Sequence, residues 1–270
     1  RINMNNYVLG VYNGTRWFFN NDDLIKKTSD YHITVNMASV RCDGLESAVN
    51  MADEYNFYPT DGLTLFQRTG DEYFRIMGGW DVTASPGVTA REGMNKLTPV
   101  TNWRGYCSKY NYAVGTTDGG ENAVTGYIFE KMNASDKKDV NDRGNSKGLN
   151  TLLYDFKAYK ANFILGDYFV ALGAGVTNAK PAMEGGIRTT IDQTAHIGAV
   201  TVIEKGKEKP LQEGRQSLIT FEGQPVWVMQ EGKFAYRVLP EFTRKAFVLT
   251  ETCPTNWIKR NRGNAKKGDL

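Results

Sequence analysis

The sequence predicts an all-β protein in which several antiparallel sheets pack face to face. Short runs of β-branched and aromatic residues alternate with polar ones, and 28 glycines are scattered between these runs, as expected for many tight turns. No window of about fifteen residues carries apolar side chains with the period of an amphipathic helix. The chain has 270 residues, 40% of them hydrophobic, and is therefore long enough to bury a substantial core.

The first clear strand is Tyr31–Met37. Its large apolar side chains fall on every second position, namely Tyr31, Ile33, Val35 and Met37. Successive side chains of a strand point to opposite faces, so this spacing predicts a half-buried strand with these four residues facing the core.

Two hairpins follow later in the chain. The runs Asn162–Leu165 and Tyr168–Leu172 flank Gly166 and Asp167, a pair typical of a tight β-turn. A second pair of apolar runs is separated by four residues that include Gly232. The further strands expected in this part of the chain are Pro225–Met229, Phe234–Leu239, Ala199–Ile203 and Ala246–Thr250.

Three other segments have a different character. Glu46–Glu54 has the length of a short helical turn, and Asn133–Thr151 is so polar that we expect an exposed loop. Basic residues fill Lys259–Lys267, which favours a solvated end. The sequence opens at Arg1 without an initiator Met or a signal peptide, and its polar end has no closing apolar strand. We therefore interpret residues 1–270 as one domain cut from a longer protein.

The composition excludes several classes of protein. A formal net charge of +3 permits a polyanionic partner without requiring one. No run of about eighteen apolar residues exists, so no membrane span is expected. Cys42, Cys107 and Cys253 are far apart and lack metal-binding spacing, and His32 and His196 lack an HxH or HExxH partner.

The carboxylates are more informative. Glu46 and Glu54 bracket a polar segment, and four others cluster further along the chain: Asp71, Glu72, Asp81 and Glu92. No GxSxG or Walker motif accompanies them. From the residues alone, the interpretation is a large β-sandwich that handles carbohydrate.

A set of motifs resembles one known family in order and spacing. The resemblance runs from about Tyr7 to Trp257 and identifies the chain as a member of polysaccharide lyase family eight, which includes hyaluronate, chondroitin AC, chondroitin ABC and xanthan lyases. The motifs are Ser39–Asn50, Asp61–Thr64, Gly70–Phe74, Trp80–Thr89, Thr117–Gly126, Phe156–Val176 and Thr189–Gln193.

The resemblance implies a fold and a set of partners. In that family a helical α/α toroid precedes a multi-sheet antiparallel super-sandwich similar to galactose mutarotase, and this chain matches the super-sandwich. The partners implied are an acidic polysaccharide and a toroid of the same protein, with no nucleic acid and no membrane span. The implied location is secreted or periplasmic.

The implied chemistry is β-elimination on glycosaminoglycans such as chondroitin sulfate or hyaluronan. A base removes the C5 proton of a uronate and an acid protonates the leaving oxygen. The family takes its Tyr and His for these steps from the toroid, so this chain alone is expected to be inactive. Within it, Glu46 is the supporting carboxylate, with Glu54 as the alternative, and Asn50 and Arg41 bind substrate.

The resemblance also implies a possible metal ion. Some chondroitin AC-type members bind calcium around the Trp-acid…Pro-Gly segment, which makes Asp81 and Glu92 the calcium ligands expected here. Thr83 and Gly93 stand where further ligands would be expected.

Two other functions stay open. One is a non-catalytic carbohydrate-binding module in which Trp17, Trp80, Trp103 and Trp227 stack on sugar rings. The other is a mutarotase-like epimerase, which needs a His and Glu pair in one cleft; only His32 and His196 are available to it.

Overall fold

The computed structural model of the chain describes residues 12–42, 61–74, 76, 79–92, 106–133, 156–220, 223–243 and 245–254. Strands β1 to β18 and one short 3-10 helix, η3 (Val82–Ala84), are the regular elements within these ranges. The strand pairs are antiparallel. The predicted all-β, multi-sheet class is confirmed.

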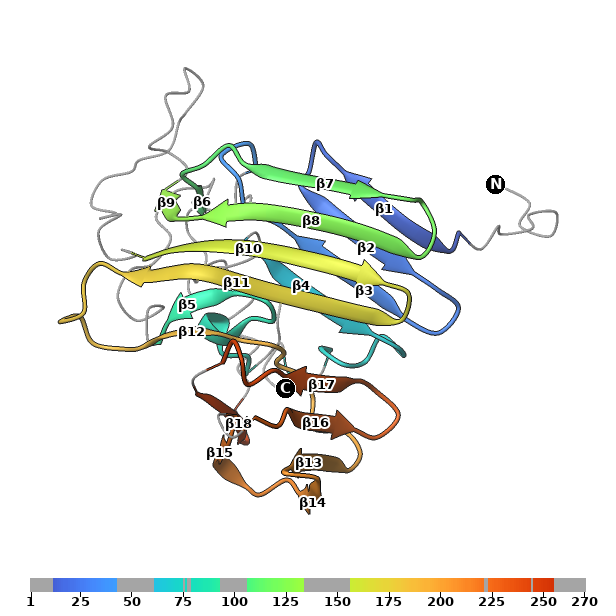
Figure 1. Ribbon diagram of the computed structural model, residues 1–270, viewed down its shortest axis with the longest axis vertical. Coiled ribbons are helices and arrows are strands. Elements are labelled where there is room, and N and C mark those ends of the chain that lie inside the picture. The colour runs from blue at the N-terminus through green and yellow to red at the C-terminus, as the bar shows by residue number, and fades with distance from the viewer. Residues whose placement is uncertain are drawn as a thin grey trace, which may run out of the picture.

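Two four-stranded sheets form a sandwich. The first has the order β1-β2-β3-β4 and the second β11-β10-β8-β7. Figure 1 shows the second sheet in front of the first. The strands of the first sheet are Gly14–Phe18, Asp23–Lys27, His32–Asn36 and Leu63–Gln67; those of the second are Ala113–Thr117 (β7), Asn122–Phe129 (β8), Phe156–Leu165 (β10) and Tyr168–Asn178 (β11).

The predicted alternation in β3 is confirmed. Ile33, Val35 and Met37 are buried in the space between the two sheets, and Tyr31 is half-buried against the same core. The facing sheet contributes alternate residues of β8 and β10 to this core. These residues are Ala123, Tyr127, Phe129, Phe156 and Ile164.

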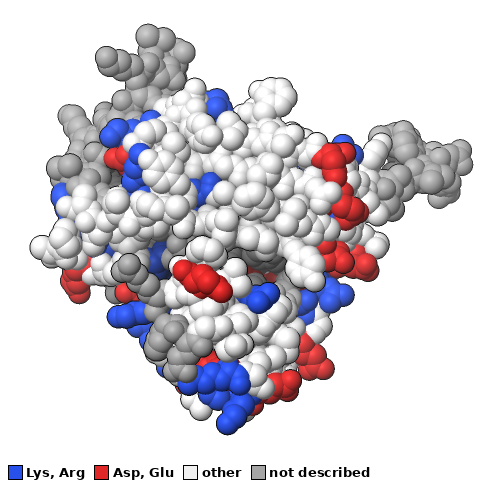
Figure 2. Space-filling view, in the orientation of Figure 1, with Lys and Arg blue, Asp and Glu red and all other residues white. Residues whose placement is uncertain are grey.

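The predicted hairpin around Gly166 is also confirmed, although its strands are longer than expected. Leu165 pairs with Tyr168, and Gly166 has a φ of +59°, a backbone conformation that glycine adopts without strain. The face of this sheet that points away from the core is largely uncharged (Figure 2). Its exposed side chains include Tyr159, Leu165, Tyr168 and Leu172.

Two small two-stranded sheets complete this part of the molecule. β5 (Thr89–Arg91) pairs with β12 (Ile187–Thr189), and Arg188 lies opposite Ala90. β6 (Tyr106–Ser108) pairs with β9 (Lys131–Asn133). The β5-β12 pair matters for the site below because it brings Arg188 close to the ends of the Asp81–Glu92 segment.

The C-terminal strands form a second unit below the sandwich (Figure 1). Its sheets have the orders β14-β13-β16-β17 and β15-β18. They enclose a small core of Val202, Leu218, Val226 and Val238. The bounds are Val200–Glu204 (β13), Lys207–Pro210 (β14), Gly214–Leu218 (β15), Val226–Gln230 (β16), Ala235–Val238 (β17) and Ala246–Thr250 (β18).

Some predicted segments lie outside the described residues. These are the short helix at Glu46–Glu54, positions 134–151 of the polar loop, and the end of the chain from position 255. Among the residues that the structure does describe, no helix has the length and apolar character needed to cross a membrane.

Candidate functional site

Arg41 lies at one end of the sandwich, just before the segment that holds Glu46. Its Nη2 contacts the Asp22 carboxylate and donates to the Ala113 carbonyl oxygen at 3.0 Å. Nη1 donates to Asn111 Oδ1, also at 3.0 Å. The guanidinium is therefore held in one orientation by the β1–β2 turn on one side and by the start of β7 on the other.

Asp22 is the residue that organises this end. It lies in the turn between β1 and β2 with a φ of +58°, and it is fully buried. Its second carboxylate oxygen accepts from Ser39 Oγ. A buried carboxylate is stable only when paired and hydrogen-bonded, so Asp22 and Arg41 depend on each other.

The predicted substrate contacts at this end remain predictions. Glu46, Glu54 and Asn50 lie outside the described residues. Arg41 is described, and much of its hydrogen-bonding capacity is used within the protein. These contacts fix the position of the chain at Arg41, shortly before Glu46 in the sequence.

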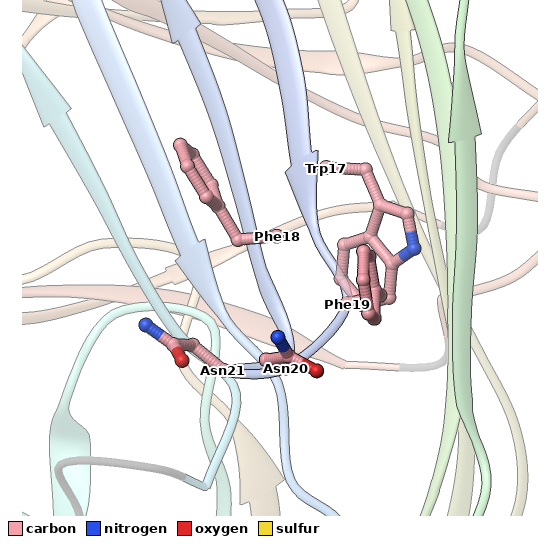
Figure 3. Close-up of a pocket in the computed structure, with 5 residues that line it drawn as sticks. All are labelled: Trp17, Phe18, Phe19, Asn20 and Asn21. Carbon is pink, nitrogen blue, oxygen red and sulfur yellow. The ribbon is translucent and has the colours of Figure 1, made fainter.

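A small aromatic hollow lies at the end of β1, close to Cys42. It is lined by Trp17, Phe18, Phe19, Asn20 and Asn21, which form the end of β1 and the turn after it. Figure 3 shows Trp17 and Phe19 on one side of the hairpin and Phe18 on the other.

The hollow touches the chain that leads to Glu46, because the Cys42 thiol lies 3.7 Å from the Asn20 carbonyl oxygen. Its volume of about 190 Å³ is below the roughly 300–1,000 Å³ of ordinary ligand pockets. Phe19 is exposed, and the side-chain amides of Asn20 and Asn21 line the hollow beside it.

Asp81 and Glu92, the predicted calcium ligands, are brought together by an arginine. Arg188 Nη2 lies 2.8 Å from Asp81 Oδ2, and Arg188 Nη1 lies 3.0 Å from Glu92 Oε1. Thr83 Oγ1 accepts from the same Nη2 at 3.1 Å. Gly93 lies outside the described residues. Within the described ranges, no group of three or more His, Cys, Asp or Glu side chains is placed to hold a metal ion.

The two histidines lie in different parts of the fold. His32 belongs to β3, where burial lowers the pKa of its imidazole, and its Nε2 lies 3.4 Å from Thr34 Oγ1. His196 is exposed and precedes β13 of the C-terminal unit. The epimerase hypothesis, which needs one histidine and one glutamate in the same cleft, stays a prediction.

Sequence reasoning missed Asp22 and Arg188. Their partners are distant in sequence: Arg188 is 96 residues from Glu92 and 107 from Asp81. No local motif marks such a contact. The one available signal at Asp22 was its place in a short polar segment between the apolar runs Trp17–Phe19 and Leu24–Ile25.

Comparison with known proteins connects this fold to one family of enzymes. A family model described as the super-sandwich domain of polysaccharide lyase family 8 matches residues 13–269. Chondroitinase-AC from Pedobacter heparinus is 28% identical over 251 residues, which are 92% of this chain and 30% of that protein. The chain thus spans about a third of the length of this curated relative.

Solved structures agree on the fold. A chondroitinase AC lyase structure, solved with oligosaccharides, has a TM-score of 0.71 at 24% identity and covers 94% of this chain and 32% of its own. A Paenibacillus xanthan lyase has a TM-score of 0.59 at 20% identity, covering 81% and 18%. A Streptomyces coelicolor chondroitin AC lyase, in complex with chondroitin sulphate, has a TM-score of 0.57 at 20% identity, covering 85% and 26%.

Proposed function

The chain belongs to polysaccharide lyase family 8, and on that premise we propose that it is the β-sandwich part of an enzyme that cleaves uronic-acid-containing polysaccharides by β-elimination. The observation that carries the proposal is the match of the family's super-sandwich domain to residues 13–269. The similarity to a chondroitinase-AC supports glycosaminoglycans of the chondroitin kind as the substrate class.

The proposed division of labour places proton transfer outside this chain. In β-elimination a base takes the C5 proton of the uronate, the electrons form the C4–C5 double bond, and the C4–O bond breaks while an acid protonates the leaving oxygen. A helical toroid of the same protein would supply the base and the acid. The sandwich would form the opposite wall of the cleft, and the isolated chain would be inactive.

Glu46 is the proposed link between the two parts. A carboxylate can orient a catalytic histidine and set its tautomer by accepting one of its N–H groups. The rigid contacts of Arg41 with Asp22 and Asn111 support this role, because they anchor the chain shortly before Glu46. Asn50, which follows Glu46, is a proposed substrate contact. Arg41 is proposed both to position this segment and to bind the uronate carboxylate with its positive charge.

The test compares the complete protein with its Glu46→Ala variant. Formation of the unsaturated uronate is followed by ultraviolet absorbance on chondroitin, dermatan, hyaluronan and xanthan. We expect turnover on at least one glycosaminoglycan and a loss of about 10- to 100-fold in kcat for the variant. Unchanged turnover would remove Glu46 from the mechanism, and no product on any of the four polymers would refute the lyase assignment.

We propose an exported location, secreted or periplasmic, because the polymeric substrate does not enter the cytoplasm. Fractionation of the producing cells followed by immunodetection tests this. Recovery of the protein in the cytoplasmic fraction alone would contradict it.

The second candidate function is a non-catalytic carbohydrate-binding module. The exposed aromatic hollow at the end of β1 favours it, with Phe19 67% exposed and the Asn20 and Asn21 amides beside it. Trp17 is a poor stacking surface by comparison, since it packs over Gly115 of β7 and against the core.

Calorimetric titration of the 270-residue chain with glycan oligosaccharides separates the two functions. Binding that Phe19→Ala abolishes, together with no lyase activity in the complete protein, favours the module. Lyase activity that survives Phe19→Ala with unchanged kcat favours the enzyme.

A further inference from the structure

The guanidinium of Arg188 lies between two carboxylates that come from different parts of the chain. Asp81 precedes the short helix η3, and Glu92 follows β5. Arg188 reaches both from β12, and its side chain is only 20% exposed. The contacts of 2.8 and 3.0 Å are charge-assisted hydrogen bonds in which one planar group binds two anions.

The oxygen atoms of this loop already accept hydrogen bonds. Asp81 Oδ1 accepts from the Thr83 backbone N–H at 2.9 Å and from Thr83 Oγ1 at 2.8 Å. The Asp81 and Ala84 carbonyl oxygens both accept from the Gln193 side-chain amide, at 2.9 and 2.8 Å. The atoms that would coordinate a metal ion are therefore engaged by N–H and O–H donors.

These residues do not fit the calcium ion that the family resemblance implies. Calcium takes about six to eight oxygen ligands at roughly 2.3–2.6 Å. Among the described residues, two carboxylates and one hydroxyl are available, so water would have to supply the remaining ligands. All three already bind a guanidinium, which places a positive charge where the ion would sit. Mutual repulsion between Arg188 and a divalent cation would oppose its binding.

A second arginine completes the balance of charge. Arg215 Nη2 lies 3.2 Å from Glu92 Oε1, and the Arg215 guanidinium packs 3.8 Å from the centre of the Phe247 ring. Both residues belong to the β15-β18 sheet of the C-terminal unit. Two arginines thus neutralise two carboxylates and connect the Asp81–Glu92 segment to both β12 and the C-terminal unit.

We propose that Arg188 is a covalently attached cation that cross-links Asp81 and Glu92 in this protein, in the place of a divalent metal ion. The inference is independent of the proposed lyase function. A chelator can remove a bound metal ion, but it cannot remove a positive charge that is part of the chain. The stability that the Arg188 cross-link provides should therefore not depend on calcium or on chelators.

The experiment measures thermal unfolding and calcium binding of the complete protein and five variants. The unmodified protein should have the same Tm in millimolar calcium and in EDTA. Arg188→Ala should lower the Tm and create a calcium dependence, with calcium restoring about 3 °C or more at saturation. Terbium luminescence sensitised by the adjacent Trp80 should appear in the same variant.

Two controls make the assignment specific. Arg215→Ala removes a contact to Glu92 and leaves Arg188 in place, so it should lower the Tm without creating a calcium response. The double variant Asp81→Asn/Arg188→Ala should lose the calcium response and the terbium signal. Together, the two controls show whether calcium binds at Asp81 or at another site in the protein.

If Arg188→Ala does not fold, Arg188→Lys takes its place, since an ammonium group reaches one carboxylate and should give a smaller Tm loss without calcium dependence. The proposal is overturned if calcium raises the Tm of the unmodified protein and Asp81→Asn abolishes that rise. It is also overturned if Arg188→Ala folds with an unchanged Tm, because the guanidinium would then not cross-link the two carboxylates.

Discussion

Tyr236 donates a hydrogen bond to Asp192, and this contact ties the C-terminal sheet to the sandwich. Asp192 also accepts from Tyr73 Oη at 3.0 Å, while the same hydroxyl accepts from the Phe66 backbone N–H at 2.9 Å. The Phe66 and Tyr236 rings pack edge to face, with centroids 6.3 Å apart. One half-buried carboxylate with two tyrosine donors therefore joins β4, β17 and the connection between β12 and β13.

The Asp192 carboxylate makes the stability of the protein depend on pH. Burial raises its pKa to about 6, and the hydrogen bonds from the two tyrosines offset only part of this effect. The folded state then holds a proton between about pH 4 and 6 that the unfolded state has released, so stability falls as pH rises through this window. The shift corresponds to about 3 kcal/mol.

Denaturant unfolding at several pH values between 4 and 7 measures this contribution. Asp192→Asn should remove it and flatten the pH dependence in that window. The exposed Asp30→Asn variant is the control and should keep the slope of the unmodified protein. A slope that persists in Asp192→Asn would assign the pH dependence to other groups.

Lys160 is buried in the sandwich although it carries an ammonium group. It points inward from β10, and its Nζ makes a long hydrogen bond of 3.5 Å to the Gly87 carbonyl oxygen. Burial lowers its pKa to about 8. The unfolded state therefore binds more protons between about pH 8 and 10.5, and this group makes the protein more stable as pH rises through that window.

Replacing the charge with an apolar chain of similar shape should stabilise the protein. We expect Lys160→Met to raise the free energy of unfolding by about 2 kcal/mol at pH 7, with the gain shrinking toward pH 10. The exposed Lys27→Met should change it by less than about 0.5 kcal/mol. A loss of stability at pH 7 in Lys160→Met would mean that the ammonium group has a polar partner that outweighs its burial.

Gly87 combines a positive φ with a close approach of neighbouring atoms. Its φ is +76°, and a Cβ built there would lie 2.6 Å from the Gly62 carbonyl oxygen and 2.5 Å from Thr64 Oγ1. Gly206 has a similar φ of +70° and open space around it. Gly206→Ala should therefore cost about 1 kcal/mol from backbone strain alone, and Gly87→Ala clearly more, because a backbone atom must also move. Equal losses by denaturant unfolding would show that the close approach is absent.

The alternation of apolar residues was enough to predict β3, the β10–β11 hairpin and β18, because each pattern is local and one face of each strand is packed. It failed for β14, where Lys207–Pro210 is exposed along its length and carries no apolar period. The same limit, that only local patterns are visible in the sequence, applies to the candidate site. The family resemblance paired Asp81 and Glu92 as calcium ligands, a role that stays a prediction, but the residue that contacts both, Arg188, comes from a strand about a hundred residues away. Contacts set by sheet pairing have no local signature.

The last prediction concerns the pair of Arg41 and Asp22. Arg41→Ala would leave the fully buried Asp22 carboxylate with the uncharged side chains of Ser39 and Cys42 as partners. It would also remove the contacts to Asn111 and the Ala113 carbonyl oxygen. We expect the free energy of unfolding to fall by about 2–3 kcal/mol, as measured by denaturant unfolding.

The control is Arg16→Ala at an exposed position, which removes a contact with the Tyr12 ring and should cost less than about 0.5 kcal/mol. In the double variant Asp22→Asn/Arg41→Ala, part of the loss should be recovered, because no buried charge remains. If Arg41→Ala instead keeps full stability and only raises KM for a uronate polymer, Arg41 contacts the substrate directly and does not position the Glu46 segment.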